Sequence, residues 1–164
     1  MNKYELKYKK IVDGLIEKSF PNLKGKKIFI SDIKFQVRNA SATVTYFGFC
    51  AWVVVWPASR KYSEKVLRGL FAHELSHYEV ILNMDFLEKI KFAFRWLFTK
   101  KGKAWFETTA DKYAIKKGYA REQHELAKIV EKGKSKEKLK KRHENGYLSS
   151  KEIKSYAKSI GKWH

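Results

Sequence analysis

The pentapeptide His73-Glu74-Leu75-Ser76-His77 contains the residues whose types and spacing fit a chemical role most closely. On a helix, residues four apart lie one turn apart on the same face, so His73 and His77 can present ring nitrogens to one metal ion. Two neutral imidazoles on a rigid helix suit zinc, and Glu74, next to the first ligand, can reach a water molecule that the metal activates. The motif therefore predicts one Zn²⁺ per chain and a hydrolytic reaction with Glu74 as general base.

A third metal ligand should lie further along the chain, because catalytic zinc takes three protein ligands and keeps one open position. Glu107 and Asp111 share one face of a predicted helix, so Glu107 can bind the metal while Asp111 accepts the other ring N–H of a ligating histidine. An ordinary acidic residue near a helix start is the alternative interpretation of Glu107. The other candidate ligands are His124, the main alternative, His143 and His164.

The elements expected to position these residues belong to an α+β fold. An amphipathic helix over residues 3–20, ended by Pro21, comes first. A small, mostly antiparallel sheet of three or four strands follows, at residues 28–30, 33–37, 42–47 and 51–56. The metal-binding helix spans about residues 63–82, with Ser63 as N-cap, and the helix of Glu107 spans about residues 104–117 and ends at Gly118. A further helix begins near Arg121, and a short terminal helix follows Ser149 and Ser150.

Residues 86–98 form an amphipathic segment between the two expected metal-binding helices. At about 100° per residue most of its large apolar side chains share one face, with Phe92 out of place among the charged residues. We expect a helix packed on the core. The alternative is a basic amphipathic helix that lies on a membrane or lines a substrate groove.

Composition and charge limit the class of protein. The chain has 164 residues, 44% of them hydrophobic, which is enough for one domain with a real core. Its net charge of +19 favours anionic partners such as nucleic acid or a membrane surface, although a lysine-rich proteome would also explain it. No specific nucleic-acid motif is present, and nothing in the pattern indicates an oligomeric state. With a single cysteine, Cys50, no disulfide can form within the chain. No signal peptide or transmembrane run is recognisable, so we expect a cytoplasmic protein, either free or peripheral to a membrane.

Two segments carry a resemblance to a known family. They are residues 68–77, Arg68-Gly69-Leu70-Phe71-Ala72-His73-Glu74-Leu75-Ser76-His77, and residues 107–118, which begin Glu107-Thr108-Thr109-Ala110-Asp111. This combination resembles the gluzincin metallopeptidases, and most closely the short archaeal-type members called minigluzincins. The resemblance covers about the middle half of the chain, from the sheet to Gly118. We expect a minimal zincin-like domain over residues 1–131, followed by a Lys-rich extension with a short helix over residues 132–164.

The resemblance also implies site residues. Zinc would bind His73, His77 and Glu107, with Glu74 as base, and a rim strand of the sheet would pair with an extended substrate. In this chain that strand would be Trp52, Val53, Val54, Val55 and Trp56. The long gap between the two metal-binding helices and the Lys-rich tail depart from the family pattern, and some short relatives resemble latent forms, so the isolated chain could be inactive.

The reaction that these features predict is hydrolysis of a peptide or protein substrate. A hydrogen-bond donor should stabilise the tetrahedral oxyanion. Four residues after Glu107 are candidates for it: Tyr113, Tyr119, Arg121 and His124. Two alternatives remain open. One is a latent or inactive zinc-binding protein that acts by interaction. The other is a membrane-surface or nucleic-acid-surface factor with a structural zinc.

Overall fold

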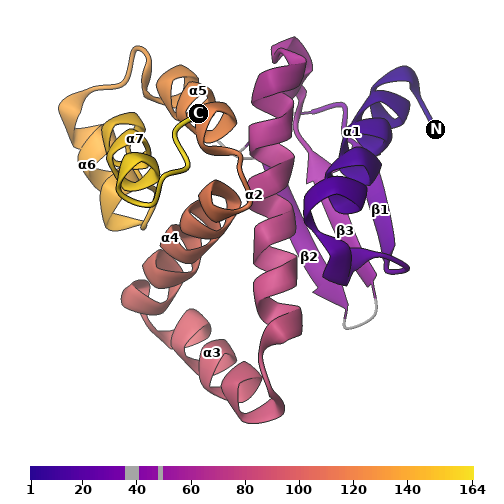
Figure 1. Cartoon of the computed structure of the whole chain (residues 1–164), viewed down its shortest axis with the longest axis horizontal. Helices are drawn as coiled ribbons and strands as arrows, with labels where there is room; N and C mark the ends of the chain where they lie inside the picture. The colour runs from indigo at the N-terminus through magenta and orange to yellow at the C-terminus, as the bar shows by residue number, and fades with distance from the viewer. Residues whose placement is uncertain (36–40, 48–49) are drawn as a thin grey trace.

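A long helix, α2, runs through the middle of the molecule, and a small sheet lies beside it (Figure 1). The structure is a computed structural model that describes residues 1–35, 41–47 and 50–164. The order of elements is an N-terminal helix, three strands and a series of helices, which confirms the predicted α+β class.

The sheet contains strands β1 (Lys27–Asp32), β2 (Ala42–Phe47) and β3 (Cys50–Val55), in the spatial order β1-β3-β2. β3 runs parallel to β1 and antiparallel to β2. The sheet is therefore mixed, whereas we expected mostly antiparallel pairing. Of the strand predicted at residues 33–37, residues 33–35 are not in a strand, and residues 36 and 37 lie outside the described part of the chain.

One face of the sheet is buried. Along β3 the side chains alternate, so that Ala51, Val53 and Val55 are buried while Trp52 is exposed. The buried face packs against α1 (Lys3–Ser19) and α2. α1 begins at an Asn2–Glu5 capping box and ends before Pro21, as predicted, because proline cannot continue the hydrogen-bond ladder. Short 3-10 helices, Pro21–Leu23 and Pro57–Lys61, follow α1 and β3.

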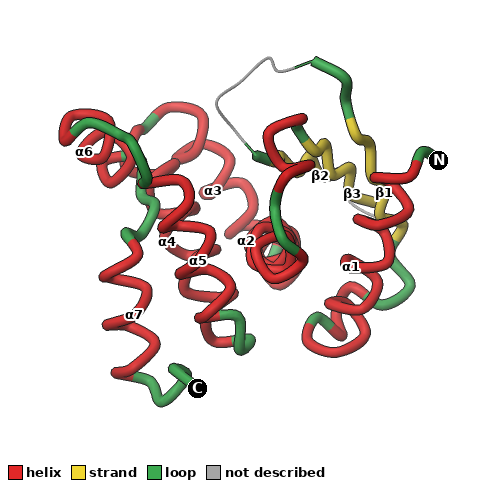
Figure 2. The backbone as a smooth tube through the Cα atoms, turned by 90° about the horizontal axis from the view of Figure 1, so that it is seen from above, coloured by secondary structure: helices red, strands yellow, loops and turns green. Residues whose placement is uncertain are grey.

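The helix α2 (Glu64–Asn83) lies between two groups of elements (Figure 2), with α1 and the sheet on one side and the later helices on the other. Ser63 caps its first turn, as expected. On the side of the later helices, the Gln123 side chain donates to the carbonyl of Gly69 at 2.7 Å. A Cβ atom at Gly69 would lie 2.6 Å from the carbonyl oxygen of Glu122, so the absence of a side chain lets α2 approach the helix that contains Glu122 closely.

Five helices follow α2: α3 (Phe86–Phe98), α4 (Lys100–Lys116), α5 (Ala120–Glu131), α6 (Lys136–Glu144) and α7 (Ser150–Ser159). α4 starts earlier than predicted because Thr99 caps it. α6 was not predicted. α7 packs onto α4 and α5 through a buried cluster that includes Ile115, Ala127 and Ile153, so residues of the C-terminal extension share a core with the preceding helices. None of the described helices is long and apolar enough to cross a bilayer.

The prediction that residues 86–98 form a helix packed on the core was correct about the helix and wrong about the packing. α3 has no buried residue. Phe92, the residue that interrupted the apolar face, is the half-buried one, and its ring contacts Trp105 and Phe106 of α4 at centroid distances of 6.2 and 4.7 Å. The larger apolar face, which we expected to pack on the core, is exposed.

Candidate metal centre

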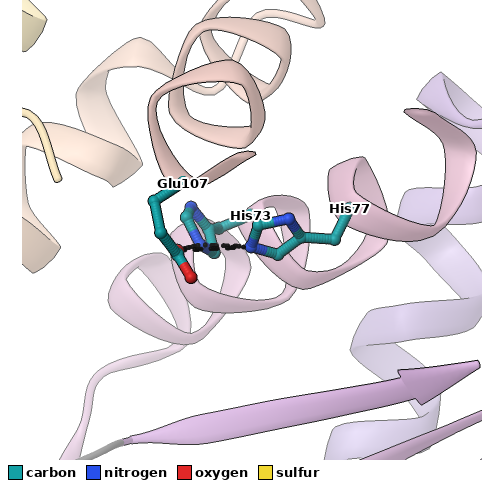
Figure 3. Close-up of side chains that lie close together, drawn as sticks. All are labelled: His73, His77 and Glu107. Atoms are coloured by element: carbon teal, nitrogen blue, oxygen red, sulfur yellow. Dashed lines mark hydrogen bonds and ion pairs between the residues drawn. The ribbon is translucent and has the colours of Figure 1, made fainter. Parts of the chain in front are cut away.

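Three side chains from two helices converge on one point. α2 contributes His73 and His77, which lie one turn apart, and α4 contributes Glu107 (Figure 3). Nε2 of His73 lies 3.2 Å from Oε2 of Glu107, and Nε2 of His77 lies 3.3 Å from the same oxygen. The two Nε2 atoms are 3.1 Å apart. The group is close enough to hold a metal ion.

The spacing of these donor atoms fits a small tetrahedral ion. Ligands at about 2.0–2.1 Å from a tetrahedral metal lie about 3.3 Å from one another, and the three observed separations are 3.1, 3.2 and 3.3 Å. Two imidazole nitrogens and one carboxylate oxygen suit zinc and neighbouring first-row metals. Three protein donors also leave the fourth tetrahedral position open.

Asp111 fixes the orientation of the first histidine. The Nδ1–H of His73 donates to Oδ1 of Asp111 at 2.8 Å, which leaves the lone pair of Nε2 directed at the shared point. This arrangement is the one predicted from the one-turn spacing of Glu107 and Asp111. Nδ1 of His77 is buried and has no hydrogen-bond partner among the described residues, so of the two Nδ1 atoms the one of His73 alone is held by a carboxylate there.

The electrostatics of the cluster favour a positive charge at its centre. Burial would lower the pKa of His73, but the hydrogen bond to Asp111 and the charges of Asp111 and Glu107 raise that pKa well above its ordinary value. Burial would raise the pKa of Glu107, but its hydrogen bonds to His73 and His77 lower it. A bound cation would take the place of the proton that these groups otherwise share.

Glu74 is buried beside the triad, with 7% of its surface exposed. Burial and the charge of Glu107 raise the pKa of its carboxyl group to about 7, against the opposing effects of His73 and the backbone N–H of Val44, which donates to it. A divalent cation at the triad would lower that pKa. The Val44 contact places the edge strand β2 directly above the general-base candidate.

A cavity of about 710 Å³ opens beside the triad. Its polar lining includes Glu74, Glu107 and both histidines. Its walls are β2 on one side and apolar side chains of α3 and α4 on the other, among them Phe92, Trp96 and Phe106. A second cavity of about 160 Å³ shares His73 and Glu74 with the first.

We predicted that the rim strand consists of Trp52, Val53, Val54, Val55 and Trp56, and this assignment is wrong. Residues 52–55 belong to β3, the central strand, whose backbone groups pair with β1 on one side and β2 on the other. A strand paired on both sides has no free edge for a substrate. β2 is the strand that lines the cavity.

The four residues predicted as oxyanion donors do not line either cavity. The hydroxyls of Tyr119 and Ser19 share a hydrogen bond of 2.8 Å, and Asn83 donates to the hydroxyl of Tyr113 at 3.5 Å. Arg121 donates to the carbonyl of His164, and Nδ1 of His124 donates to the carbonyl of Ser150. His124 is therefore also excluded as the third member of the triad.

Tyr147, between α6 and α7, lies beside the metal cluster and was not among the predicted donors. Its ring stacks on His73 with centroids 6.0 Å apart and an interplanar angle of 24°, and it lines both cavities. Burial, with the charges of Glu107 and Glu74, raises the pKa of its hydroxyl. The guanidinium of Arg142 lies 4.3 Å from the centre of its ring. No sequence motif marked this residue.

Comparisons with protein-family models, with curated proteins and with solved structures found no match for this chain.

Proposed function

We propose that the chain is a zinc-dependent metallopeptidase of the gluzincin type. The observation that carries this proposal is the convergence of His73, His77 and Glu107, with donor separations of 3.1–3.3 Å, beside the buried carboxyl of Glu74. A structural zinc is normally enclosed by four protein ligands, whereas a catalytic one keeps an open position. Three donors next to a large cavity support catalysis over a structural role.

The metal triad and the neighbouring carboxyl group of Glu74 have distinct roles in the proposed peptide hydrolysis. Zinc, when bound, would polarise the scissile carbonyl and make water more acidic. Glu74 accepts the proton of the attacking water and later delivers it to the leaving amine. Burial raises the pKa of this carboxyl group and so favours its protonated form, which helps it to accept the proton of water before it delivers that proton to the amine.

Tyr147 is the donor that we assign to the tetrahedral oxyanion. Its raised pKa keeps the phenol protonated, so the hydroxyl can donate a hydrogen bond over the whole neutral range. The stacked contact with His73 holds the ring at the metal site. The hydrogen bond from this hydroxyl would be stronger to the negatively charged oxygen of the transition state than to the carbonyl oxygen of the bound substrate.

The substrate that fits the cavity is an extended polypeptide. β2 is hydrogen bonded to β3 on one side only, and the N–H of Val44 faces Glu74 from its other edge. Because strand residues alternate, every second residue of β2 offers backbone groups to that edge. An added peptide strand would pair there, and the rings of Phe92, Trp96 and Phe106 favour an apolar substrate side chain.

The test is digestion of a diverse peptide library by zinc-loaded protein, with Glu74→Gln as the matched control and mass spectrometry as the readout. We expect cleavage by the parent alone, at sites that share an apolar residue. Glu74→Gln should retain one zinc per chain, because Glu74 is not one of the three converging donors. Absence of cleavage by the zinc-loaded parent, or equal cleavage by both proteins, would contradict the proposal.

A further inference from the structure

α3 presents an unusual apolar surface to solvent. We define the α3 face as Phe86, Leu87, Ile90, Phe94 and Phe98, which are between 40% and 75% exposed. At about 100° per residue these side chains fall within an arc of about 120° on one side of the helix. Phe94 and Phe98 stack with their ring centroids 5.9 Å apart, so the apolar surface is continuous over a full turn.

The helix is fixed to the molecule along its opposite side. Phe92 packs on Trp105 and Phe106, and Gly102 in the first turn of α4 allows close approach to the backbone of Arg95. Lys103 lies over the ring of Trp96, 5.4 Å from its centre. α3 therefore has a defined orientation, and the α3 face lies on the side of the helix away from Phe92, the residue that packs on α4. Figure 1 shows α3 at one end of the molecule.

Basic side chains surround the α3 face. Between residues 85 and 103 the chain has six basic residues, Lys89, Lys91, Arg95, Lys100, Lys101 and Lys103, and two acidic ones, Asp85 and Glu88. Both acidic side chains form the capping box of α3 and accept backbone hydrogen bonds at its N-terminus. Their charge is thus opposed by the helix dipole, and the surface next to the apolar arc is strongly positive.

This combination selects one kind of partner. A second copy of the chain would bring six cations against six cations, so like-charge repulsion opposes self-association through this face. Nucleic acid would satisfy the lysines but leave five large apolar side chains in water. An anionic bilayer matches both features, because apolar side chains enter the acyl boundary while Lys and Arg reach the lipid phosphates.

We propose that the α3 face binds the surface of an anionic lipid bilayer, with α3 lying in the interface. α3 also lines the cavity beside the metal triad, through Phe92 and Trp96 and through Leu97, which falls within the apolar arc at about 100° per residue. A docked molecule therefore holds that cavity against the membrane surface. This binding is independent of metal and of turnover, so it stands or fails separately from the proposed peptidase activity.

The experiment is cosedimentation of the full chain with vesicles of phosphatidylcholine containing phosphatidylglycerol, and with vesicles of phosphatidylcholine alone. The apolar variant is Phe94→Gln with Phe98→Gln, and its matched control is Leu6→Gln with Ile129→Gln, two exposed apolar positions on other helices. The charge variant is Lys91→Gln with Arg95→Gln, and its control is Lys7→Gln with Lys10→Gln on α1. Glutamine preserves helix propensity, and circular dichroism checks the fold of each protein.

We expect the parent to bind the anionic vesicles and to bind phosphatidylcholine at least tenfold more weakly. The apolar variant should lose about tenfold or more in affinity because buried phenyl groups are removed. The charge variant should lose about fivefold per cation removed. The charge control should lose at most about twofold per substitution, which is the smaller long-range share of the net charge. The apolar control removes no charge and should bind as the parent does. Peptide cleavage in solution should be unchanged in the apolar variant.

Three results would overturn the proposal. The first is no binding of the parent to anionic vesicles. The second is an equal loss in the α3 variants and their controls, which would show attraction by net charge alone. The third is a concentration-dependent dimer, or a complex with duplex DNA, that the apolar variant abolishes while vesicle binding persists, because another occupant would then cover the α3 face.

Discussion

The carboxylate of Asp111 connects His73 to the backbone of Leu148. Oδ1 accepts the Nδ1–H of His73 at 2.8 Å, and Oδ2 accepts the N–H of Leu148 at 2.9 Å. The same side chain thus orients a metal-binding imidazole and holds the segment that carries Tyr147. Two parts of the site that lie far apart in the sequence are joined by one buried group, 3% exposed.

Asp111→Asn should therefore weaken both functions. An amide can accept through only one atom, so its NH₂ group would face either the His73 N–H or the Leu148 N–H. We expect zinc affinity to fall by about 10–100-fold, the usual effect of losing a group that orients a metal-ligating histidine. Competition with a chromophoric chelator measures it. Asp13→Asn, on the exposed side of α1, is the control and should bind zinc as the parent does; equal affinity of Asp111→Asn would contradict the role of Asp111.

Tyr147→Phe tests the assigned oxyanion donor. Removal of one such donor lowers kcat by about 10²–10³-fold, and we expect that loss with little change in KM or zinc content. Steady-state kinetics on a peptide identified from the library gives both constants. Tyr113→Phe and Tyr119→Phe remove hydroxyls whose partners lie outside the cavities, so they should leave kcat unchanged. A parental kcat in Tyr147→Phe would transfer the role to another donor.

Metal removal should destabilise the fold as well as abolish activity. A metal at the triad joins α2 to α4 and binds only the folded chain, so zinc at about a thousand times its dissociation constant adds about 4 kcal/mol. For a domain of this size that corresponds to a Tm increase on the order of 10 °C. Differential scanning calorimetry with zinc or with chelator measures the shift. Glu107→Ala should show a much smaller difference between the two conditions, and a parent Tm that ignores zinc would argue against the site.

Gly69→Ala tests the close approach of α2 and α5. The new Cβ would meet the Glu122 carbonyl at 2.6 Å, and relieving that overlap should cost about 1–3 kcal/mol of unfolding free energy. Gly14→Ala is the matched control, because a Cβ there meets nothing within 4 Å on helix α1. It should stabilise the protein by about 0.5–1 kcal/mol through the helix propensity of alanine. Urea denaturation of both variants decides the comparison, and equal stabilities would show that the two helices can separate without cost.

The helix α2 and its pair of histidines were predictable because the evidence for them is local. A capping serine at residue 63, an apolar repeat at helical spacing and the four-residue separation of His73 and His77 all lie within one stretch of chain. The pairing of Glu107 with Asp111 is local in the same sense. These patterns predicted which face of each helix contains the candidate metal ligands, and in the structure His73, His77 and Glu107 lie together.

Relationships that depend on tertiary contacts were not predictable in this way. The parallel pairing of β1 with β3 leaves no mark on the alternation of either strand, so the edge strand was assigned wrongly. α3 has the predicted bounds, but an apolar arc does not say whether it faces a core or solvent. α6 has one large aliphatic residue, Leu139, and hence no apolar stripe. Tyr147 follows α6 in a short connection, residues 145–149, that has no periodicity.

The position of Tyr147 has a consequence for the order of events during synthesis. All three metal-binding side chains precede residue 108, and Tyr147 leaves the ribosome some forty residues after Glu107. Its segment must then dock on α4, where Thr108 donates to the carbonyl of Gly146 at 2.6 Å. At Gly146, with φ of 92°, a Cβ would collide with the backbone of Ala104. In the proposed peptidase, metal binding can therefore precede catalysis during synthesis, because the assigned oxyanion donor is the last part of the site to be made.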